Sequence, residues 1–257
     1  MGDQSRIQYV SNVGSDVSET FTGERFVPGL CGEIELEHVH RYLFARQFAE
    51  GRDVLDIACG EGYGCSLMSD VARTVIGVDI DAAVIERAKS SHASQSIDFK
   101  EGTCTSIPMD DDSIDIVVSF ETIEHIEKHH EFMSEIRRVL RPDGLLLIST
   151  PDTRTYVDSS PEQNPFHVKE MEKQEFVDFL VDAFSHARFG VQRCLTGSFM
   201  APLDSESSMT TPALYRMEAD SGTIEQSGRF ADDGMFLIGI ASDGPLPSID
   251  WSLLDDP

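Results

Sequence analysis

The chain has 257 residues, of which 40% are hydrophobic and 26% are charged. This composition is typical of a globular protein with one α/β domain and a sizeable core, and no apolar run approaches the roughly 18 residues of a membrane-spanning helix. The net charge of −26 argues against a nucleic-acid-binding or anionic-membrane-binding surface. It predicts either an ordinary solvated acidic surface or adaptation to high salt.

The N-terminus lacks the basic and apolar regions of a secretory signal, and Arg6 stands where a myristoylation signal needs Ser or Thr. The cysteines form no CxxC pair, and their odd number leaves at least one unpaired. A reduced, soluble, cytoplasmic protein is therefore expected. The five cysteines are Cys31, Cys59, Cys65, Cys104 and Cys194.

Apolar residues recur at helical spacing in His38–Glu50, which predicts an amphipathic helix. Apolar runs and amphipathic segments then alternate along the chain. Strands are predicted at Asp53–Ala58, Thr74–Asp79, Ile97–Lys100, Ile114–Phe120, Leu145–Thr150, near Phe189–Cys194 and at Met235–Ala241. Helices are predicted at Gly62–Val71, Asp81–Ser90, Lys128–Leu140 (closed by Arg-Pro-Asp-Gly) and Glu172–Ala183. This alternation indicates an α/β fold with a doubly wound, mostly parallel sheet covered by helices on both faces.

Three regions are expected. Residues 1–37 form a partly ordered N-terminal segment that contributes to a helical lid, and 1–23 carry no apolar pattern. Residues 38–242 form the main domain, with a polar insertion at 195–233 before the last strand. Residues 243–257 form a peripheral tail rich in Pro and Asp.

The segment VLDIACGEGYG (Val54–Gly64) is a strand, a glycine turn and the start of a helix. Glycines let a ligand approach the main chain closely, and a helix start presents free N–H groups. Both dinucleotides and S-adenosylmethionine use this arrangement. The dinucleotide spacing GxGxxG fails, because Cys65 or Leu67 stands where the third glycine is needed. Nearby carboxylates repel a pyrophosphate and suit a cationic ligand.

Asp79 ends the second strand of this βαβ unit, where a carboxylate can accept both ribose hydroxyls of a bound nucleoside. Ile80, next to it, could pack on the adenine face. The alternative is that Asp79 only caps the following helix.

The motifs VLDIACGEGYG, VIGVDID, SFETIEHI and RVLRPDGLLLISTPD together resemble the class I S-adenosylmethionine-dependent methyltransferases. Within that class, TGERFVPG, GEIELEHVHRYLFA and NPFHVKEM look like a bacterial subgroup associated with glycan biosynthesis. The resemblance implies a seven-stranded sheet whose last strand, Met235–Ala241, is antiparallel.

The resemblance also implies that the glycine loop, with Gly62 in it, binds the methionine end of the cofactor through Asp56, Ala58 and Gly60. The ribose and adenine would lie on Asp79 and Ile80. Many relatives carry Asp after the third strand, where this chain has Thr103 and Cys104. The Thr103 hydroxyl or the backbone would make the contact to the adenine amino group.

The helix before the first strand lies over the cofactor in related folds. Arg41 could pair with the methionine carboxylate, and Tyr42 could pack near the methyl group. Alternatively, Arg41 is a solvated helix residue and Tyr42 a core residue. Phe120 is expected at a strand end, with its carbonyl towards the cofactor amine.

Methyl transfer to a hydroxyl needs a general base, whereas transfer to an amine depends on one less. His167 is favoured over His125, which with Glu124 follows the fourth strand, although either histidine could instead be structural. His125 and His129 are four residues apart, but without an HExxH pattern no metal is expected. His129 and His130 are expected at an exposed helix start.

The leading hypothesis is a methyltransferase that acts on a hydroxyl of a sugar or glycan intermediate. The first alternative is an N- or O-methyltransferase of a small metabolite such as a quinone or natural product. A nucleotide-dependent oxidoreductase and a non-catalytic, cofactor-binding partner subunit are the alternatives of other classes. A homodimer is also considered, with 195–233 supplying either its contacts or acceptor specificity.

Overall fold

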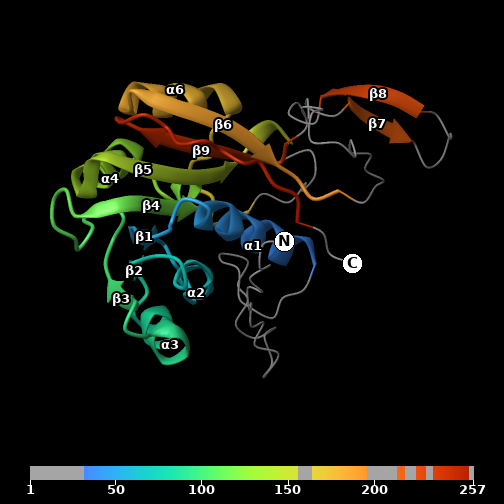
Figure 1. Cartoon of the computed structure of the whole chain (residues 1–257). Helices are drawn as coiled ribbons and strands as arrows, with labels where there is room; N and C mark the ends of the chain where they lie inside the picture. The colour runs from blue at the N-terminus through green and yellow to red at the C-terminus, as the bar shows by residue number, and fades with distance from the viewer. Residues whose placement is uncertain (1–31, 156–163, 196–212, 218–223, 230–233, 255–257) are drawn as a thin grey trace, which may run out of the picture.

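The computed structural model describes residues 32–155, 164–195, 213–217, 224–229 and 234–254. Its centre is a seven-stranded sheet with the order β3-β2-β1-β4-β5-β9-β6 (Figure 1). The strands are β1 (Asp53–Ile57), β2 (Thr74–Asp79), β3 (Ile97–Glu101), β4 (Ile114–Phe120), β5 (Leu140–Pro151), β6 (His186–Gln192) and β9 (Phe236–Ser242). Neighbours pair in parallel except β9, which is antiparallel to both β5 and β6. The predicted fold, with its antiparallel last strand, is confirmed.

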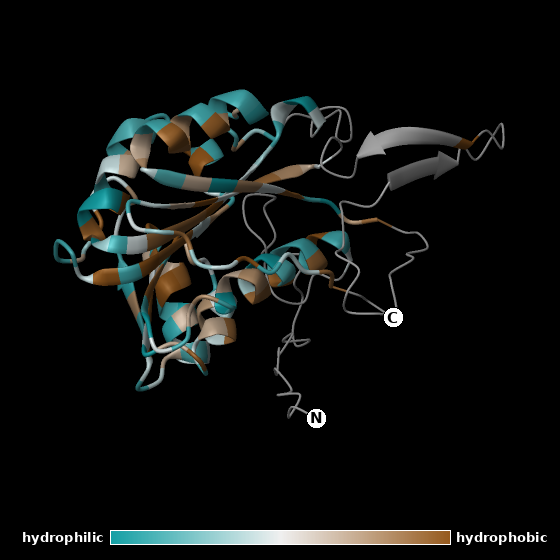
Figure 2. Cartoon of the chain, turned by 45° about the horizontal axis from the view of Figure 1, so that its top comes forward, coloured by the Kyte–Doolittle hydropathy of each residue, from teal (hydrophilic) through white to brown (hydrophobic). Residues whose placement is uncertain are grey.

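Helices cover both faces of this sheet, and apolar residues gather where the layers meet (Figures 1 and 2). The helices are α1 (Glu33–Arg46), α2 (Tyr63–Met68), α3 (Ala82–His92), the 3-10 helix η2 (Ile123–His125), α4 (His129–Val139) and α6 (Lys173–Ala183). One core cluster joins the sheet to α1, α2 and α3, and the other joins it to α4 and α6. The two apolar layers hold the carboxyl ends of β1, β4 and β5 at one rigid edge.

Helix α1 begins five residues before the predicted start, His38, and ends at Arg46 rather than Glu50. The apolar spacing marks only the buried stripe, which begins with Val39. The first turn instead follows Gly32, whose φ is 110°, and carries Glu33 and Glu35. Carboxylates in a first turn are favourable because they face the positive end of the helix dipole.

Strand β5 also begins earlier than predicted, at Leu140. Leu140 pairs with Ile114 and Leu145 with Ile116, so the Arg-Pro-Asp-Gly segment bulges out between two paired stretches. The turn chemistry was correctly recognised, but a bulge accommodates it within one strand. Strand β6 likewise begins three residues before the predicted Phe189.

The stretch 195–233 contains a two-stranded antiparallel sheet, β7 (Ala213–Met217) with β8 (Ile224–Arg229), which the sequence did not predict. It is separate from the seven-stranded sheet (Figure 1). Neither Ala-Leu-Tyr-Arg-Met nor Ile-Glu-Gln-Ser-Gly-Arg alternates apolar and polar residues, so the pattern by which a strand is recognised is absent. Among the described residues, none of the helices is both long and apolar enough to cross a bilayer.

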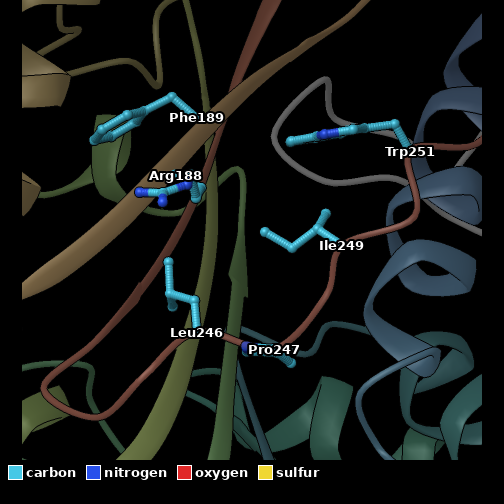
Figure 3. Close-up of a pocket in the computed structure, with 6 residues that line it drawn as sticks. All are labelled: Arg188, Phe189, Leu246, Pro247, Ile249 and Trp251. Carbon is cyan, nitrogen blue, oxygen red and sulfur yellow. The ribbon is translucent and has the colours of Figure 1, made fainter. Parts of the chain in front are cut away.

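The segment after Ser242 lies against α1. The Trp251 ring stacks on Phe44 with centroids 5.2 Å apart, and the backbone N–H of Asp250 donates to Gln47 Oε1 (3.0 Å). The segment also encloses a hollow of about 310 Å³ against the first half of β6, lined by Arg188, Phe189, Leu246, Pro247, Ile249 and Trp251 (Figure 3). This hollow lies away from the carboxyl ends of the strands.

Candidate active site

The loop after β1 turns through left-handed backbone at three positions: φ is 60° at Ala58, 53° at Gly60 and 80° at Gly62. A Cβ at Gly62 would overlap the Phe99 ring at 2.6 Å, whereas a Cβ at Gly60 would meet nothing within 4 Å. The loop is therefore packed tightly underneath and open at Gly60, where a ligand can reach the main chain. Ala58 lacks the freedom of glycine, and its conformation costs about 1–2 kcal/mol.

Asp79 fastens this loop to the end of β2. Its carboxylate accepts the backbone N–H of Gly60 and of Asp81, each at 3.0 Å. The cap of α3 is Asp81, whose side chain accepts from Ala83 and Val84. The reading of Asp79 as a helix cap is therefore wrong, and its carboxylate borders the open side of the loop.

Asp56 lies beneath the loop and is fully buried. The Tyr42 hydroxyl donates to both of its carboxylate oxygens (3.2 Å each), and the Cys65 thiol donates to one (3.4 Å). Burial raises the pKa of Asp56 to about 7, against the lowering effect of these donors. Tyr42 also meets the Phe120 ring edge-on, with centroids 5.3 Å apart. Tyr42 is thus part of the core and also a hydrogen-bond partner of Asp56.

Arg41 is only 3% exposed, so it is not a solvated helix residue. Its Nε donates to Gln192 Oε1 (2.6 Å), and its guanidinium lies 4.2 Å from the centre of the Phe236 ring. Nη1 lies 3.7 Å from Glu121 Oε1. Within the described part of the chain, Nη1 and Nη2 have no hydrogen-bond acceptor. A buried guanidinium with donors to spare fits a carboxylate ligand.

Glu121 connects this arginine to the sheet, and it was not among the predicted site residues. It follows β4 with φ at 51°, and its carboxylate accepts the Ser149 hydroxyl at 2.6 Å. Strained non-glycine backbone gathers at functional sites. The only sequence signal was the position of Glu121 directly after a buried strand.

The rim of the site is formed by the segments after β2 and β3. Ile80 is 69% exposed beside Asp79, as a platform for a flat ring would be. Thr103 and Cys104 are half-buried, and the Thr103 hydroxyl lies 3.5 Å from that of Thr105. Phe120 is buried, and its carbonyl accepts the Thr122 hydroxyl (3.2 Å).

A second group of side chains meets beyond β4 and β5. One side-chain nitrogen or oxygen atom from each of Glu124, His125 and His167 lies within 4.8 Å of the other two. The two imidazole rings meet edge-on with centroids 5.1 Å apart. Glu124 is 1% exposed, and Thr150 donates to its Oε2 (3.3 Å). Burial, followed by the neighbouring Glu121, holds the pKa of Glu124 well above its usual range.

Backbone contacts fix this group although its members are far apart in sequence. The Glu124 carbonyl accepts the N–H groups of Val168 (2.8 Å) and Lys169 (3.0 Å). His167 Nδ1 lies 2.6 Å from Glu170 Oε1, and Asn164 Nδ2 lies 3.1 Å from His167 Nε2. His167 is thus held by a carboxylate on one nitrogen and an amide donor on the other. Glu170 was not predicted.

His129 is not part of this group. It begins α4 but is 3% exposed, with its ring 6.1 Å from that of Phe179. The expectation of an exposed position is therefore wrong for His129 and right for His130. His129 is buried because the apolar face of α4 begins with it.

Comparisons with known proteins identify the cofactor. Residues 55–148 match the family model of a methyltransferase domain. A probable S-adenosylmethionine-dependent methyltransferase of Mycolicibacterium smegmatis is 37% identical over 213 residues, which are 80% of each chain. The chain belongs to the S-adenosylmethionine-dependent methyltransferases.

Two further comparisons show how far the likeness extends. A ubiquinone biosynthesis O-methyltransferase of Brucella ovis is 38% identical to this methyltransferase over 104 residues, 39% of this chain and 42% of that protein. A methyltransferase structure from Archaeoglobus fulgidus shares the fold with a TM-score of 0.58 and 18% identity, and the match covers 82% of this chain and 94% of the other. The methyltransferase uses S-adenosylmethionine as its cofactor.

Proposed function

We propose that the enzyme transfers the methyl group of S-adenosylmethionine to a hydroxyl of a sugar or glycan intermediate. The observation that carries this proposal is His167, held by Glu170 next to Glu124 and His125 at the carboxyl ends of β4 and β5. A sugar hydroxyl has a pKa far above neutrality, so its attack is assisted by a positioned proton acceptor.

The glycine loop and α1 would hold the cofactor. Its methionine end would lie over Ala58, Gly60 and Gly62, with Asp56 beneath, because the loop is open at Gly60. The spare N–H groups of Arg41 would bind the methionine carboxylate. Tyr42 and the Phe120 carbonyl would border the same end.

The nucleoside would extend towards β2 and β3. Asp79 would accept the ribose hydroxyls and Ile80 would pack on the adenine. Thr103 and Cys104 would meet the edge of the adenine through the Thr103 hydroxyl or the backbone. This placement would direct the methyl group towards β4, on the side of Glu124 and the two histidines.

The bound cofactor supplies a methyl group already activated by the sulfonium. As the new C–O bond forms and the C–S bond breaks, the hydroxyl proton would pass to His167 Nε2. The Asn164 amide donates to that nitrogen, so it is the unprotonated one, and Nδ1–H donates to Glu170. The acceptor hydroxyl would replace the amide as donor. Glu124 and His125 would border the acceptor and help to orient it.

The test is His167→Ala, with His130→Ala as a matched control because His130 is an exposed histidine in α4. The acceptor comes from a methyl-transfer screen of sugar nucleotides and lipid-linked glycans. His167→Ala should lose turnover by about 100-fold or more and keep its affinity for S-adenosylhomocysteine. Full turnover in this variant would refute the base role.

A second candidate is methylation of a small metabolite such as a quinone, favoured by the likeness to the ubiquinone biosynthesis enzyme. That likeness covers only 39% of this chain. The same methyl-transfer screen is extended to phenols and amines. Methylation of these compounds, with no methylation of sugars, would favour the second candidate. Calorimetry with S-adenosylmethionine, S-adenosylhomocysteine and NAD tests the other classes. Cofactor binding without turnover on any acceptor would indicate a non-catalytic partner subunit.

We further propose that 195–233, an insertion with the hairpin β7–β8 within the main domain 38–242, serves acceptor choice or a homodimer contact. The net charge of −26 supports an acceptor other than nucleic acid. The free cysteines among the described residues fit a reducing cytoplasm.

A further inference from the structure

We infer that Glu124, His125 and His167 form a binding site for one divalent transition-metal ion of the Zn²⁺ type. The sequence offered no metal motif, because the three residues come from η2 and from a loop some forty positions later. A metal site needs at least three His, Cys, Asp or Glu ligand atoms close together. Among the described residues, these three side chains meet that condition, with one ligand atom of each within 4.8 Å of the others.

The tautomers of both histidines suit metal binding. His125 Nδ1 lies 3.0 Å from the Phe166 carbonyl oxygen, so Nδ1 carries the proton and donates it. His167 Nδ1 donates to Glu170 at 2.6 Å. In each ring Nε2 is then the nitrogen with the lone pair. Histidine ligands commonly donate their other N–H to a carbonyl or carboxylate in this way.

The carboxylate ligand is also prepared. Glu124 is 1% exposed, and its Oε1 has no hydrogen-bond partner among the described residues. Its Oε2 is held by the Thr150 hydroxyl at 3.3 Å. A buried carboxylate oxygen without a donor is costly, and a cation would satisfy it.

The required rearrangement is small. A tetrahedral ion with ligand distances of about 2.0–2.1 Å keeps its ligand atoms about 3.3 Å apart. One ligand atom from each of the three residues lies within 4.8 Å of the others, so modest side-chain rotations would bring both Nε2 atoms and Glu124 Oε1 around one ion. The Asn164 amide, 3.1 Å from His167 Nε2, would turn away. The fourth position would face the acceptor.

Two nitrogens and one oxygen favour a borderline ion such as Zn²⁺ or Co²⁺ over Mg²⁺, which prefers oxygen ligands. The ion would take the His167 Nε2 lone pair that accepts the proton. Its binding should therefore inhibit methyl transfer. This effect on turnover rests on the proposed function, whereas the binding itself does not.

Binding is measured by calorimetry with ZnCl₂ on the untagged, chelator-treated full chain, and by the visible absorption of bound Co²⁺. One Zn²⁺ should bind per chain. His125→Ala should weaken binding at least 100-fold, and Glu170→Gln should weaken it about 10- to 100-fold. The control His130→Ala should leave it unchanged, and Mg²⁺ should not compete.

Thermal melting and S-adenosylhomocysteine affinity, both unchanged in His125→Ala, would show that the variant is folded. Equal Zn²⁺ affinity in the wild type and His125→Ala would overturn the metal site. Zn²⁺ that binds at this site and raises turnover would support the site and refute the role of His167 as base. Loss of turnover in His167→Ala, without any Zn²⁺ binding to the wild type, would support His167 as the base and refute the metal site.

Discussion

Asp56 provides the most direct test of the electrostatics beneath the glycine loop. Burial raises its pKa from 3.8 to about 7. The protonated form therefore contributes stability that is fully present below pH 3.8 and is lost as the pH rises towards 7. At about 1.4 kcal/mol per pKa unit, the ionised carboxyl costs the folded protein about 4 kcal/mol at pH 8.

Asp56→Asn removes this titration and keeps the shape of the side chain. The amide still accepts from Tyr42, but its NH₂ group has no acceptor on the Cys65 side, which costs about 1–3 kcal/mol. Relative to the wild type, the variant should gain about 3 kcal/mol between pH 5 and pH 8. The stability lost through the unpaired NH₂ group is the same at pH 5 and pH 8, so it cancels in this difference.

The assay is thermal unfolding of the ligand-free protein at pH 5, 6, 7 and 8. At about 2–4 °C per kcal/mol, the difference in melting temperature should shift by roughly 6–12 °C over this range. Asp98→Asn, at an exposed strand position, is the control and should show no such trend. A difference between wild type and Asp56→Asn that does not change with pH would refute the reasoning.

Three further substitutions separate packing from ligand binding. In Gly60→Ala the new Cβ meets no atom within 4 Å, so the melting temperature should fall by only a few degrees. Calorimetry should nevertheless show at least a tenfold loss of S-adenosylhomocysteine affinity. Unchanged affinity would place the cofactor elsewhere. In Gly64→Ala the Cβ would lie 2.1 Å from the Tyr42 ring, so overpacking should lower the free energy of unfolding by about 1–3 kcal/mol, as measured with denaturant. An unfolding midpoint equal to that of the wild type would contradict the close contact between Gly64 and Tyr42. Arg41→Gln should weaken S-adenosylhomocysteine binding roughly 10- to 100-fold, and it should weaken binding of decarboxylated cofactor, which lacks the carboxylate, much less. Equal losses for both ligands would exclude the carboxylate contact.

The sheet could be predicted because its strands are buried on both faces and therefore read as short apolar runs. Ile114–Phe120 is one such run, and its bounds agree with the structure. The start of α1 could not be predicted in this way, because Gly32 and the two glutamates of the first turn carry no apolar signal. The hairpin β7–β8 was missed because neither of its strands alternates apolar and polar residues.

The proposed cofactor side of the site followed from local sequence, since Asp56 at the end of β1 and Gly60 and Gly62 in the turn after it lie in one continuous segment. The roles of Asp56 and Arg41 depend on distant partners. Tyr42 reaches Asp56 from another element, and Gln192 holds Arg41 from 151 positions later in the chain. Such contacts leave no periodic pattern in a single sequence.

The residues of the proposed acceptor side were predicted separately and not as a group. His125 and His167 were considered as alternative bases, but the structure brings them together through the Glu124 carbonyl, which holds the loop after Phe166. Glu170 was missed because its role depends on the direction in which His167 points. Backbone hydrogen bonds of this kind are not encoded by residue type.

The position of β9 has a consequence for the order in which the protein can form during synthesis. β9 is the last strand to be made, yet it lies between β5 and β6, which precede it. Until the ribosome has released Phe236–Ser242, the sheet has a gap with two open edges, and such edges invite pairing with other chains. Of the two residues that hold Arg41, Gln192 ends β6 at one edge of that gap, and Phe236 begins the strand that fills it. A nascent chain can therefore complete the glycine loop early, whereas the arginine that faces it is fixed only after the last strand has been inserted.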